Sequence, residues 1–326
     1  MKKRILSGIR PTGPLHLGHL FGAIDNWVKL QDQYECFFMV ADWHALMSEY
    51  EKPSKLPQYV LECVADWIAC GIDPEKSTIF VQSQVKEHLD LYMVFSNFVP
   101  LGWLERCPTY KEQLRELASR KLHTYGFLGY PVLQAADILL YKADAVPVGK
   151  DQIPHLELTN DIAARFNSIY GKIFSEIKPL LTDIPKLLGL DGRKMSKSYG
   201  NFIALGDGED TIKEQCGKMF TDPMRIKISD KGHPEKCNVR SYYALFKPDY
   251  APEVDKYCRK ALMGCTECKR NLASLISDYL SDIRKKRAAL LEDKARIYSI
   301  LEKGAKKAKD VGSRTMDEVK KKMKIA

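Results

Sequence analysis

Apolar and polar positions follow two different periods along the first half of the chain. Short, nearly continuous apolar runs, typical of buried strands, lie at residues 4–9, 36–42, 77–83 and 144–149. Apolar residues recur at helical spacing between these runs, at residues 18–33, 56–72, 130–141 and 150–171. We expect the third of these helices to begin at Pro131, because proline is tolerated in the first helical turn. Alternation of strands and helices predicts a doubly wound parallel α/β sheet of Rossmann-like topology.

The strand signal fades in the second half of the chain. A glycine-rich basic loop, LDGRKMSKSYGN, occupies residues 190–201, and residues 203–326 have a mostly helical pattern. We therefore expect a mostly helical C-terminal domain. The predicted divisions are a Rossmann-like catalytic domain at 1–190, the loop at 191–202, a helical domain at 203–290, and a C-terminal helix at 291–326 that packs back on the first domain.

Composition narrows the class of protein. The chain has 51 basic and 42 acidic residues, a net charge of +9, and its lysines are concentrated in the last 43 residues. This charge suits a polyanionic partner, although a solvated basic surface is an equally good interpretation. There is no apolar run long enough to span a membrane, and the N-terminus lacks the apolar core of a secretory signal. We expect a cytoplasmic protein that does not bind membranes.

Two histidines, His16 and His19, flank Gly18 in the segment GPLHLGHLFG, directly after the first predicted strand. A metal site would need further ligands, and the neighbouring sequence has none. The pair is also compatible with two histidines that merely satisfy a helix start. The third interpretation is phosphate binding, because a helix start exposes backbone N–H groups, glycine permits close approach, and imidazoles donate hydrogen bonds.

The basic loop carries a second candidate site. Lys194 and Lys197 lie three residues apart in KMSKS, with Gly192 before them and Gly200 after them. Two ammonium groups on a mobile loop can close over a triphosphate and neutralise a departing pyrophosphate. An ordinary basic surface loop explains KMSKS alone, but both motifs in this order are much less expected by chance.

The two motifs together resemble the HIGH and KMSKS signatures of class I aminoacyl-tRNA synthetases, which have a HUP-type Rossmann-like fold. Over nearly its whole length the chain resembles the bacterial-type tryptophanyl-tRNA synthetases. The resemblance is carried by the segments GIRPTGPLHLGH, ADWHAL, YPVLQAADILLY, VPVGKDQIPHLELTNDIAARFN, GRKMSKS and KKAKDVGSRTMDEVKKKM. It implies a tryptophan–tRNA ligase that forms tryptophanyl-adenylate and pyrophosphate from L-tryptophan and Mg-ATP. The tryptophanyl group then passes to the 3′-terminal adenosine of tRNA(Trp).

The resemblance also implies roles for individual residues. The catalytic set is His16, His19, Lys194 and Lys197. ATP-binding residues are Arg10, Pro11, Thr12, Gly18, His19, Gly22, Gly149, Lys150, Asp151, Lys194, Met195, Ser196, Lys197 and Ser198. Gly22 leaves room for the adenine, and residues 149–152 form the ribose-binding loop. Tryptophan-binding residues are Leu6, Gly8, Tyr130, Gln134, Asp137 and Gln152. The family further implies a homodimer, and that residues 203–290 bind the tRNA anticodon.

Asp137 matches the residue that reads the indole N–H. An acid suits this role because indole only donates, and an analogue without the N–H leaves the acid unpaired in an apolar pocket. The sequence departs from the commonest family pattern at Arg10, where many members have glutamine, and at Leu6, where an aromatic residue is common. We expect Arg10 to add a phosphate contact, while Leu6 leaves the packing around the indole open.

The nine cysteines fall into two groups. Five are isolated in apolar or mixed settings and are expected to be packed thiols: Cys36, Cys63, Cys70, Cys107 and Cys216. The other four, Cys237, Cys258, Cys265 and Cys268, have the spacing C-x20-C-x6-C-x2-C, which suits a zinc or iron–sulfur site. A subset of tryptophanyl-tRNA synthetases has a similar pattern and carries a [4Fe–4S] cluster. We expect that cluster here, with Zn²⁺ or unligated thiols as alternatives.

Three other functions share individual features of this sequence. A tyrosyl-tRNA synthetase shares the fold, but the sequence lacks the acceptor pattern for a phenol. A small nucleotidylyltransferase also uses H-x-G-H, but such chains are usually shorter and lack KMSKS and the helical C-terminal region. A non-catalytic RNA-binding redox protein could use the cysteines, yet both nucleotide motifs are intact.

Overall fold

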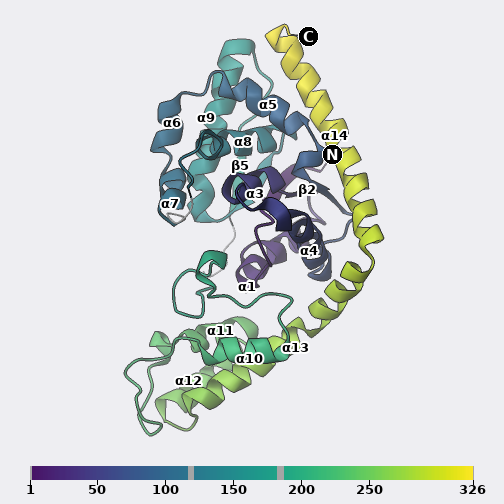
Figure 1. The fold of residues 1–326 in the computed structure, drawn as a ribbon. Helices are drawn as coiled ribbons and strands as arrows, with labels where there is room; N and C mark the ends of the chain where they lie inside the picture. The colour runs from purple at the N-terminus through teal and green to yellow at the C-terminus, as the bar shows by residue number, and fades with distance from the viewer. Residues whose placement is uncertain (1, 117–120, 182–186, 326) are drawn as a thin grey trace. The chain divides into compact units, whose positions relative to one another are not determined.

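The computed structural model describes residues 2–116, 121–181 and 187–325, except the side chains of residues 116 and 198. The chain forms two compact units (Figure 1). The first unit comprises Met1–Thr12, Ala23–Asp183 and Leu290–Ala326, and the second comprises Gly13–Gly22 and Ile184–Ala289. The segment with the two histidines therefore belongs to the same unit as the basic loop.

The first unit is built on a five-stranded parallel sheet. Its order is β3-β2-β1-β4-β5, so the first strand is central and the chain winds outward on both sides of it. The strands are β1 (Arg4–Ile9), β2 (Glu35–Val40), β3 (Ser77–Val81), β4 (Ala145–Val148) and β5 (Lys178–Leu181). This arrangement confirms the predicted doubly wound sheet. The four predicted strands are present, and β5 is an edge strand that the apolar pattern did not predict.

Helices cover the sheet because right-handed crossovers place them on its faces. The helices of the first unit are α2 (Asp25–Leu30), α3 (Asp42–Glu49), α4 (Leu56–Ala69), α5 (Glu87–Ser96), α6 (Leu101–Arg106), α7 (Pro108–Glu116), α8 (Tyr125–Leu140), α9 (Ile153–Tyr170) and α14 (Lys294–Met323). The prediction that the third helix begins at Pro131 is wrong. Thr124 caps α8 by accepting a hydrogen bond from Phe127 N (3.2 Å), so Pro131 lies inside the helix.

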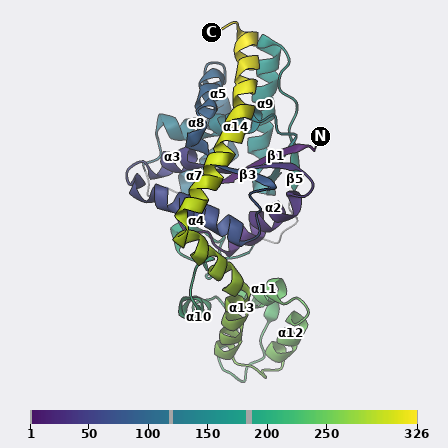
Figure 2. The ribbon, with the colours of Figure 1, turned by 90° about the vertical axis from the view of Figure 1, so that its right-hand side faces the viewer.

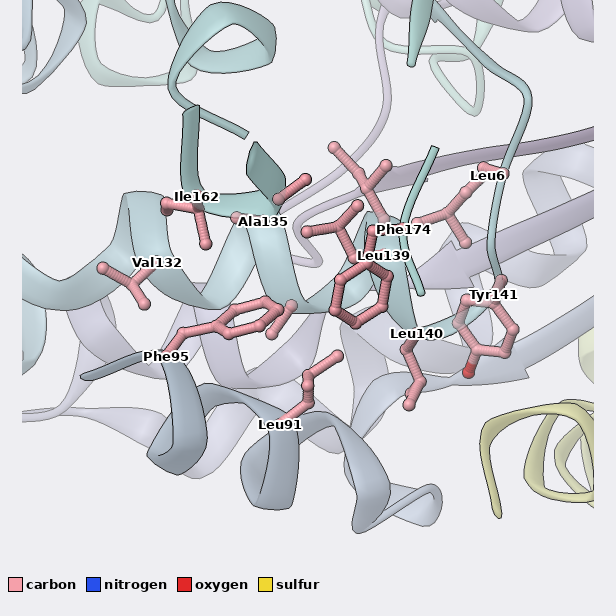
Figure 3. Packing of buried hydrophobic residues seen from close by; sticks show 14 of the residues in the cluster. Leu6, Leu91, Phe95, Val132, Ala135, Leu139, Leu140, Tyr141, Ile162 and Phe174 are labelled. Atoms are coloured by element: carbon pink, nitrogen blue, oxygen red, sulfur yellow. The ribbon is translucent and has the colours of Figure 1, made fainter. Parts of the chain in front are cut away.

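The main hydrophobic core lies between the sheet, α5, α8 and α9. Figure 3 shows Leu91 and Phe95 of α5 facing Val132 and Leu139 of α8. The aromatic rings meet edge to face, as Phe95 does with Phe166 and Phe174. Because α8 is buried along most of its length, any polar side chain on it must find partners inside the unit.

The C-terminal helix α14 packs on β3 at very short range (Figure 2). A Cβ atom placed on Gly304 would lie 1.8 Å from the carbonyl oxygen of Ile79. Only glycine allows the helix backbone to approach the strand this closely. Farther along the helix, Ser313 donates a hydrogen bond to Glu87 Oε1 of α5 (2.7 Å).

The second unit is mostly helical outside the two nucleotide motifs. Its helices are α1 (Leu17–His19), α10 (Glu209–Gly217), α11 (Asn238–Phe246), α12 (Ala251–Arg259) and most of α13 (Cys265–Glu292). A π-helical segment, Leu20–Ile24, follows α1. Short π segments are frequent at functional sites. Within the described part of the chain, no helix has the length and apolar character required to cross a membrane.

Candidate nucleotide and amino-acid site

The two histidines form a cap at the start of α1. The backbone N–H of Gly18 donates to His16 Nδ1 (3.1 Å), and the backbone N–H of His16 donates to His19 Nδ1 (3.2 Å). The two rings are 3.9 Å apart between centroids. Because each Nδ1 accepts, each neutral ring carries its proton on Nε2 and can donate from there.

Both rings are kept neutral. Burial, and then the positive charge of Lys197, lower the pKa of His16 from 6.5 to about 3. Burial is the main cause that lowers the pKa of His19 well below its ordinary value, followed by the neighbouring His16 and Lys197. A neutral imidazole with Nε2–H donates to a phosphoryl oxygen without a change of protonation between pH 5 and 8.

The basic loop packs against the histidine segment. Lys197 Nζ donates to the carbonyl oxygen of Gly13 (2.9 Å), and the side chain of Met195 is buried beside Gly18. A Cβ atom on Gly18 would lie 3.3 Å from Met195 Sδ. His16 also forms an isolated antiparallel bridge with Ala204, just after the loop. The structure thus brings the two motifs together within one unit, although they are about 180 residues apart in the sequence.

Asn201 fixes the conformation of the loop. Its Oδ1 accepts from Ser196 N (2.8 Å), and its Nδ2 donates to Asp191 Oδ1 (2.7 Å) and to Lys194 O (3.2 Å). The hydrogen bond from Asn201, and then those from Arg193, lower the pKa of Asp191 to about 2. Lys194 is exposed, and the side chain of Ser198 lies outside the described residues.

The other predicted nucleotide residues are divided between the units. Arg10, Pro11 and Thr12 directly follow β1 in the first unit. Residues 149–152 directly follow β4 in that unit, where a short 3-10 helix (Lys150–Gln152) leads into α9. Gly22 belongs to the second unit, and among the described residues no atom lies within 4 Å of a Cβ built on it.

Asp137 is the centre of a buried polar network in the first unit. Its Oδ2 accepts from His44 Nε2 (2.7 Å), and its Oδ1 accepts from Gln82 Nε2 (2.8 Å) and His88 Nδ1 (2.7 Å). The hydroxyl of Tyr141 lies 2.8 Å from His88 Nε2. Burial opposes ionisation of Asp137, but His44 and the hydrogen bonds outweigh it and hold the pKa of this carboxyl below its usual value. Asp137 is therefore a buried carboxylate.

Two further predicted residues lie on the same helix, α8. Tyr130 is buried, and its hydroxyl is 3.2 Å from His155 Nε2. His155 Nδ1 in turn lies 3.3 Å from Thr109 Oγ1. Burial is the main cause that lowers the pKa of His155 to about 4. Gln134, one turn before Asp137, is half-buried. Gln152 is also half-buried and lies at the start of α9.

Leu6 and Gly8 lie on the central strand β1. Leu6 is buried in the main core cluster. A Cβ atom on Gly8 would lie 2.6 Å from the carbonyl oxygen of Met39 on β2, so the close pairing of these strands requires glycine.

The four late cysteines share one pocket of the second unit. The pocket holds about 320 Å³ of space, part of it open to solvent, and Cys237, Cys258, Cys265 and Cys268 all line it. A Cβ atom on Gly232 would lie 2.4 Å from Cys258 Sγ, so glycine at this position makes room for the thiol. Across the described ranges, however, no group of three or more His, Cys, Asp or Glu residues is arranged to hold a metal ion.

Of the other five cysteines, Cys36, Cys63, Cys107 and Cys216 are buried and Cys70 is half-buried. Burial raises the pKa of both Cys36 and Cys216 to about 12, as expected of packed, unreactive thiols.

Sequence reasoning missed the residues that support these sites. Gln82, His88, Tyr141, Asn201 and His155 were not singled out, because each acts through a partner distant in the sequence or on an irregular segment. His44, Tyr141, His155 and Asn201 lie within segments quoted above, but the sequence alone assigns them no role. The local signal available for His88 is its place in an amphipathic helix, α5, beside apolar residues such as Leu91 and Phe95.

Comparisons with known proteins show the family of this chain. The family described as tRNA synthetases class I (W and Y) matches residues 1–281. A tryptophan–tRNA ligase of Thermotoga maritima is 50% identical over 99% of both chains. Another, of Aquifex aeolicus, is 41% identical over 99% of this chain and 100% of its own.

A solved structure is also similar over the full length. It is a tryptophanyl-tRNA synthetase of Campylobacter jejuni in complex with ADP and tryptophan, with a TM-score of 0.90 and 36% identity, over 99% of this chain and 100% of that one. The chain therefore belongs to the class I aminoacyl-tRNA synthetases, among the bacterial tryptophan–tRNA ligases.

Proposed function

We propose that this tryptophan–tRNA ligase forms tryptophanyl-adenylate with the histidine pair and the basic loop. The tryptophan carboxylate attacks the α-phosphorus of ATP, a P–O bond forms, and the bond to pyrophosphate breaks. The Nε2–H groups of His16 and His19 donate to phosphoryl oxygens, and Lys194 and Lys197 neutralise the charge that develops on pyrophosphate. The observation that carries this proposal is the contact between the two motifs, with both imidazoles neutral and capped through Nδ1.

The remaining ATP contacts are assigned by the family pattern. Arg10, Pro11, Thr12 and Gly18 approach the phosphates, and Gly22 leaves room for the adenine. Gly149, Lys150 and Asp151 bind the ribose, since a carboxylate after a parallel strand accepts from ribose hydroxyls. Met195, Ser196 and Ser198 complete the loop, and Mg²⁺ accompanies ATP as part of the substrate.

Tryptophan is bound by a pocket in the first unit. Asp137 accepts a hydrogen bond from the indole N–H, which the ionised, fully buried carboxyl supports. Tyr130, Gln134 and Gln152 orient the amino acid, while Leu6 and Gly8 form the sheet side of the pocket. The Campylobacter jejuni relative was solved with tryptophan and ADP, ligands of the chemical classes proposed here.

The proposal is tested by Lys194→Ala and Lys197→Ala in tryptophan-dependent ATP–pyrophosphate exchange. We expect each to lower kcat by about tenfold or more, the effect of losing a charged transition-state contact. Lys213→Ala is a matched control, because Lys213 is an exposed lysine of the same unit with only an exposed partner, Asp210. Unchanged adenylate formation in both loop variants would show that the loop is not catalytic. Exchange that depends on tyrosine instead would overturn the amino-acid assignment.

We also propose that Cys237, Cys258, Cys265 and Cys268 hold a [4Fe–4S] cluster, with Zn²⁺ as the alternative. Four thiols line one pocket and are the donor type that either group needs, although the described residues are not gathered as a metal site in this structure. Gly232 makes room for Cys258. Burial, and then the neighbouring thiols, raise the pKa of Cys268 to about 12, so this cysteine is a thiol unless a cation binds. The bound group would cross-link α12, α13 and the residue that precedes α11, Cys237.

The test is anaerobic purification followed by iron, sulfide and zinc analysis. A broad visible absorbance with about four iron and four sulfide per chain supports the cluster, whereas one zinc without absorbance supports the alternative. Cys268→Ser should lose the bound group, and Cys70→Ser, outside the pocket, should retain it. Neither iron nor zinc in the fresh protein would refute both.

The larger context is proposed from the family alone. We expect a cytoplasmic homodimer whose residues 203–290 bind the anticodon of tRNA(Trp), with a catalytic domain at 1–190, a loop at 191–202 and a C-terminal helix at 291–326. Sedimentation equilibrium tests the dimer, and aminoacylation of tRNA(Trp) variants tests the anticodon region.

A further inference from the structure

A line of three buried polar groups leads to the proposed indole-reading carboxylate. The Tyr141 hydroxyl contacts His88 Nε2 at 2.8 Å, and His88 Nδ1 contacts Asp137 Oδ1 at 2.7 Å. Tyr141 and His88 have no exposed surface, and Asp137 is 2% exposed. The three come from two helices and the residue after one of them: His88 from α5, Asp137 from α8, and Tyr141 directly after α8.

The positions of the protons follow from the partners. A carboxylate only accepts, so Nδ1 of His88 must carry a proton and donate to Asp137. Burial, and then the negative charges of Asp137 and Glu87, raise the pKa of Tyr141 well above its usual value, so its hydroxyl is always protonated. We assign the Tyr141 hydroxyl as the donor to Nε2, an assignment that makes His88 the Nδ1–H tautomer.

Tyr141 has little freedom to leave this position. Its ring stacks on Phe37 at 4.9 Å between centroids and meets the edge of Phe80 at 5.5 Å. Its backbone carbonyl accepts from Arg4 Nη1 (2.6 Å). Figure 3 shows the Tyr141 ring among apolar side chains, with the hydroxyl oxygen at its tip. The rigid ring fixes the hydroxyl, and the hydroxyl fixes the imidazole.

The Asp137 carboxylate accepts three hydrogen bonds from the side chains around it. A carboxylate has about four acceptor positions, two on each oxygen. Both positions on Oδ1 are occupied, by His88 and Gln82, and one on Oδ2 is occupied by His44. Counting contacts from the described residues, one acceptor position therefore remains, on Oδ2.

We propose that Tyr141 and His88 are positioning residues for tryptophan recognition: they hold the Asp137 carboxylate so that the one remaining acceptor, on Oδ2, is presented to the indole N–H. This inference rests on the proposed role of Asp137 and adds to it the atom that reads the ligand and the residues that orient it. The function is specificity, because an amino acid without the N–H leaves that acceptor unpaired.

The main test is Tyr141→Phe, which removes one hydroxyl and keeps the ring. kcat/KM for ATP–pyrophosphate exchange is measured with tryptophan and with β-(3-benzothienyl)alanine, which replaces the N–H by sulfur. We expect the preference for tryptophan to fall about 3- to 10-fold, the effect of one net hydrogen bond, through KM for tryptophan. Activity with the analogue and KM for ATP should stay at wild-type values. If Tyr141 had only a structural role, Tyr141→Phe would lower kcat/KM equally for tryptophan and for the analogue, and that result would refute the proposal.

Two controls make the result specific. Tyr50→Phe removes a tyrosine hydroxyl that bonds the carbonyl of Lys121 in the same unit, outside the Asp137 network, and should leave the preference unchanged. Asp137→Asn tests the proposed function itself and should abolish most of the preference. If Asp137→Asn loses the preference while Tyr141→Phe retains it, the positioning role fails and the role of Asp137 stands. If Asp137→Asn also retains it, the proposed tryptophan site is wrong.

The tautomer of His88 gives a readout that does not depend on activity. In ¹⁵N-histidine-labelled wild-type protein, His88 should show a protonated Nδ1 and an unprotonated Nε2 at pH 7, with the signal identified by its loss in His88→Gln. Tyr141→Phe should shift this signal toward the other protonation states. A wild-type His88 with both nitrogens protonated, or with the proton on Nε2, overturns the proposed chain of donors.

Discussion

Substitution by alanine should have different effects on stability and activity at two glycines of the histidine segment, Gly18 and Gly22. A Cβ atom on Gly18 would lie 2.9 Å and 3.0 Å from two atoms of the His16 ring, Cε1 and Nδ1. A Cβ atom on Gly22 meets nothing within 4 Å in the described part of the protein. Gly18→Ala therefore disturbs the folded protein itself, whereas Gly22→Ala fills space that the proposed function reserves for the adenine.

The expected changes in the free energy of unfolding and in kcat/KM follow from these contacts. Gly18→Ala pushes the His16 ring away from the N–H that it caps, and losing a cap costs about 1 kcal/mol, with a further penalty for overpacking. Gly22→Ala removes a glycine from a helical segment, and should be neutral or stabilise by up to about 1 kcal/mol. With ATP bound, the Gly22 methyl group meets the adenine, and we expect kcat/KM for ATP to fall at least about tenfold, or roughly 1.4 kcal/mol.

The assay combines urea unfolding with ATP–pyrophosphate exchange over a range of ATP concentrations. Gly217→Ala is the matched control: it lies in the same unit, also in open space, and should change neither quantity much. Wild-type kcat/KM for ATP in Gly22→Ala would refute the placement of adenine beside this glycine. A Gly18→Ala protein as stable as wild type would refute the role of the His16 cap.

Three further predictions concern stability, pH and the loop. Gly304→Ala should lower the free energy of unfolding by at least about 2 kcal/mol, because its Cβ would lie 1.8 Å from the Ile79 carbonyl oxygen. Gly312→Ala is the control in the same urea titration: its Cβ would meet only side-chain atoms, at 3.3 Å and beyond, so the substitution should be tolerated. The pKa of His16 is about 3 in the folded protein and 6.5 in the unfolded chain, so between these values only the unfolded chain binds a proton at His16. The contribution of neutral His16 to the free energy of unfolding is therefore complete above pH 6.5 and is lost as the pH falls toward 3. His16→Asn should make the fall shallower by about 1.4 kcal/mol per pH unit, and parallel unfolding curves for the two proteins between pH 6.5 and 4.5 would contradict the shift. Asn201→Ala removes three hydrogen bonds within the basic loop. It should lower kcat for tryptophan activation about tenfold and leave KM for tryptophan within twofold of wild type. A change confined to KM for tryptophan would argue against a role of the loop in activation.

Most of the sheet was predictable from the sequence because its strands are buried on both faces. β2 and β3 are buried along nearly their whole length, and such strands read as continuous apolar runs. β5 was missed for the opposite reason. It is a four-residue edge strand with Lys178 and Leu181 exposed and Pro179 inside it, and proline in a short run argues against a strand. A strand at the edge of a sheet can contain proline and exposed residues, although this sequence pattern disfavours a strand.

The boundary of α8 shows a second limit. Pro131 is a good first-turn residue, so the apolar segment that begins beside it predicted a helix start there. The real start is the Thr124 cap, six residues earlier than the predicted segment, in a stretch rich in glycine and aromatic residues that shows no helical period. Burial of α8 on most sides, rather than local propensity, stabilises a helix with proline in its interior.

The histidines show why half of the site was readable from the sequence and half was not. His16 and His19 interact with each other and with Gly18, so the pattern H-x-G-H contains the whole arrangement within four residues. His44 and His88 are defined by one carboxylate that lies 93 and 49 residues away, respectively. No local pattern encodes that meeting, because it is created by the order in which β2, β3 and α8 pack. A buried histidine needs hydrogen-bond partners, however, and a fold of known topology indicates which polar residue on the facing helix can supply one. Asp137 is polar within the apolar run of α8, so once the parallel sheet is accepted, the pairing of α5 with α8 follows from the need of both residues for a partner.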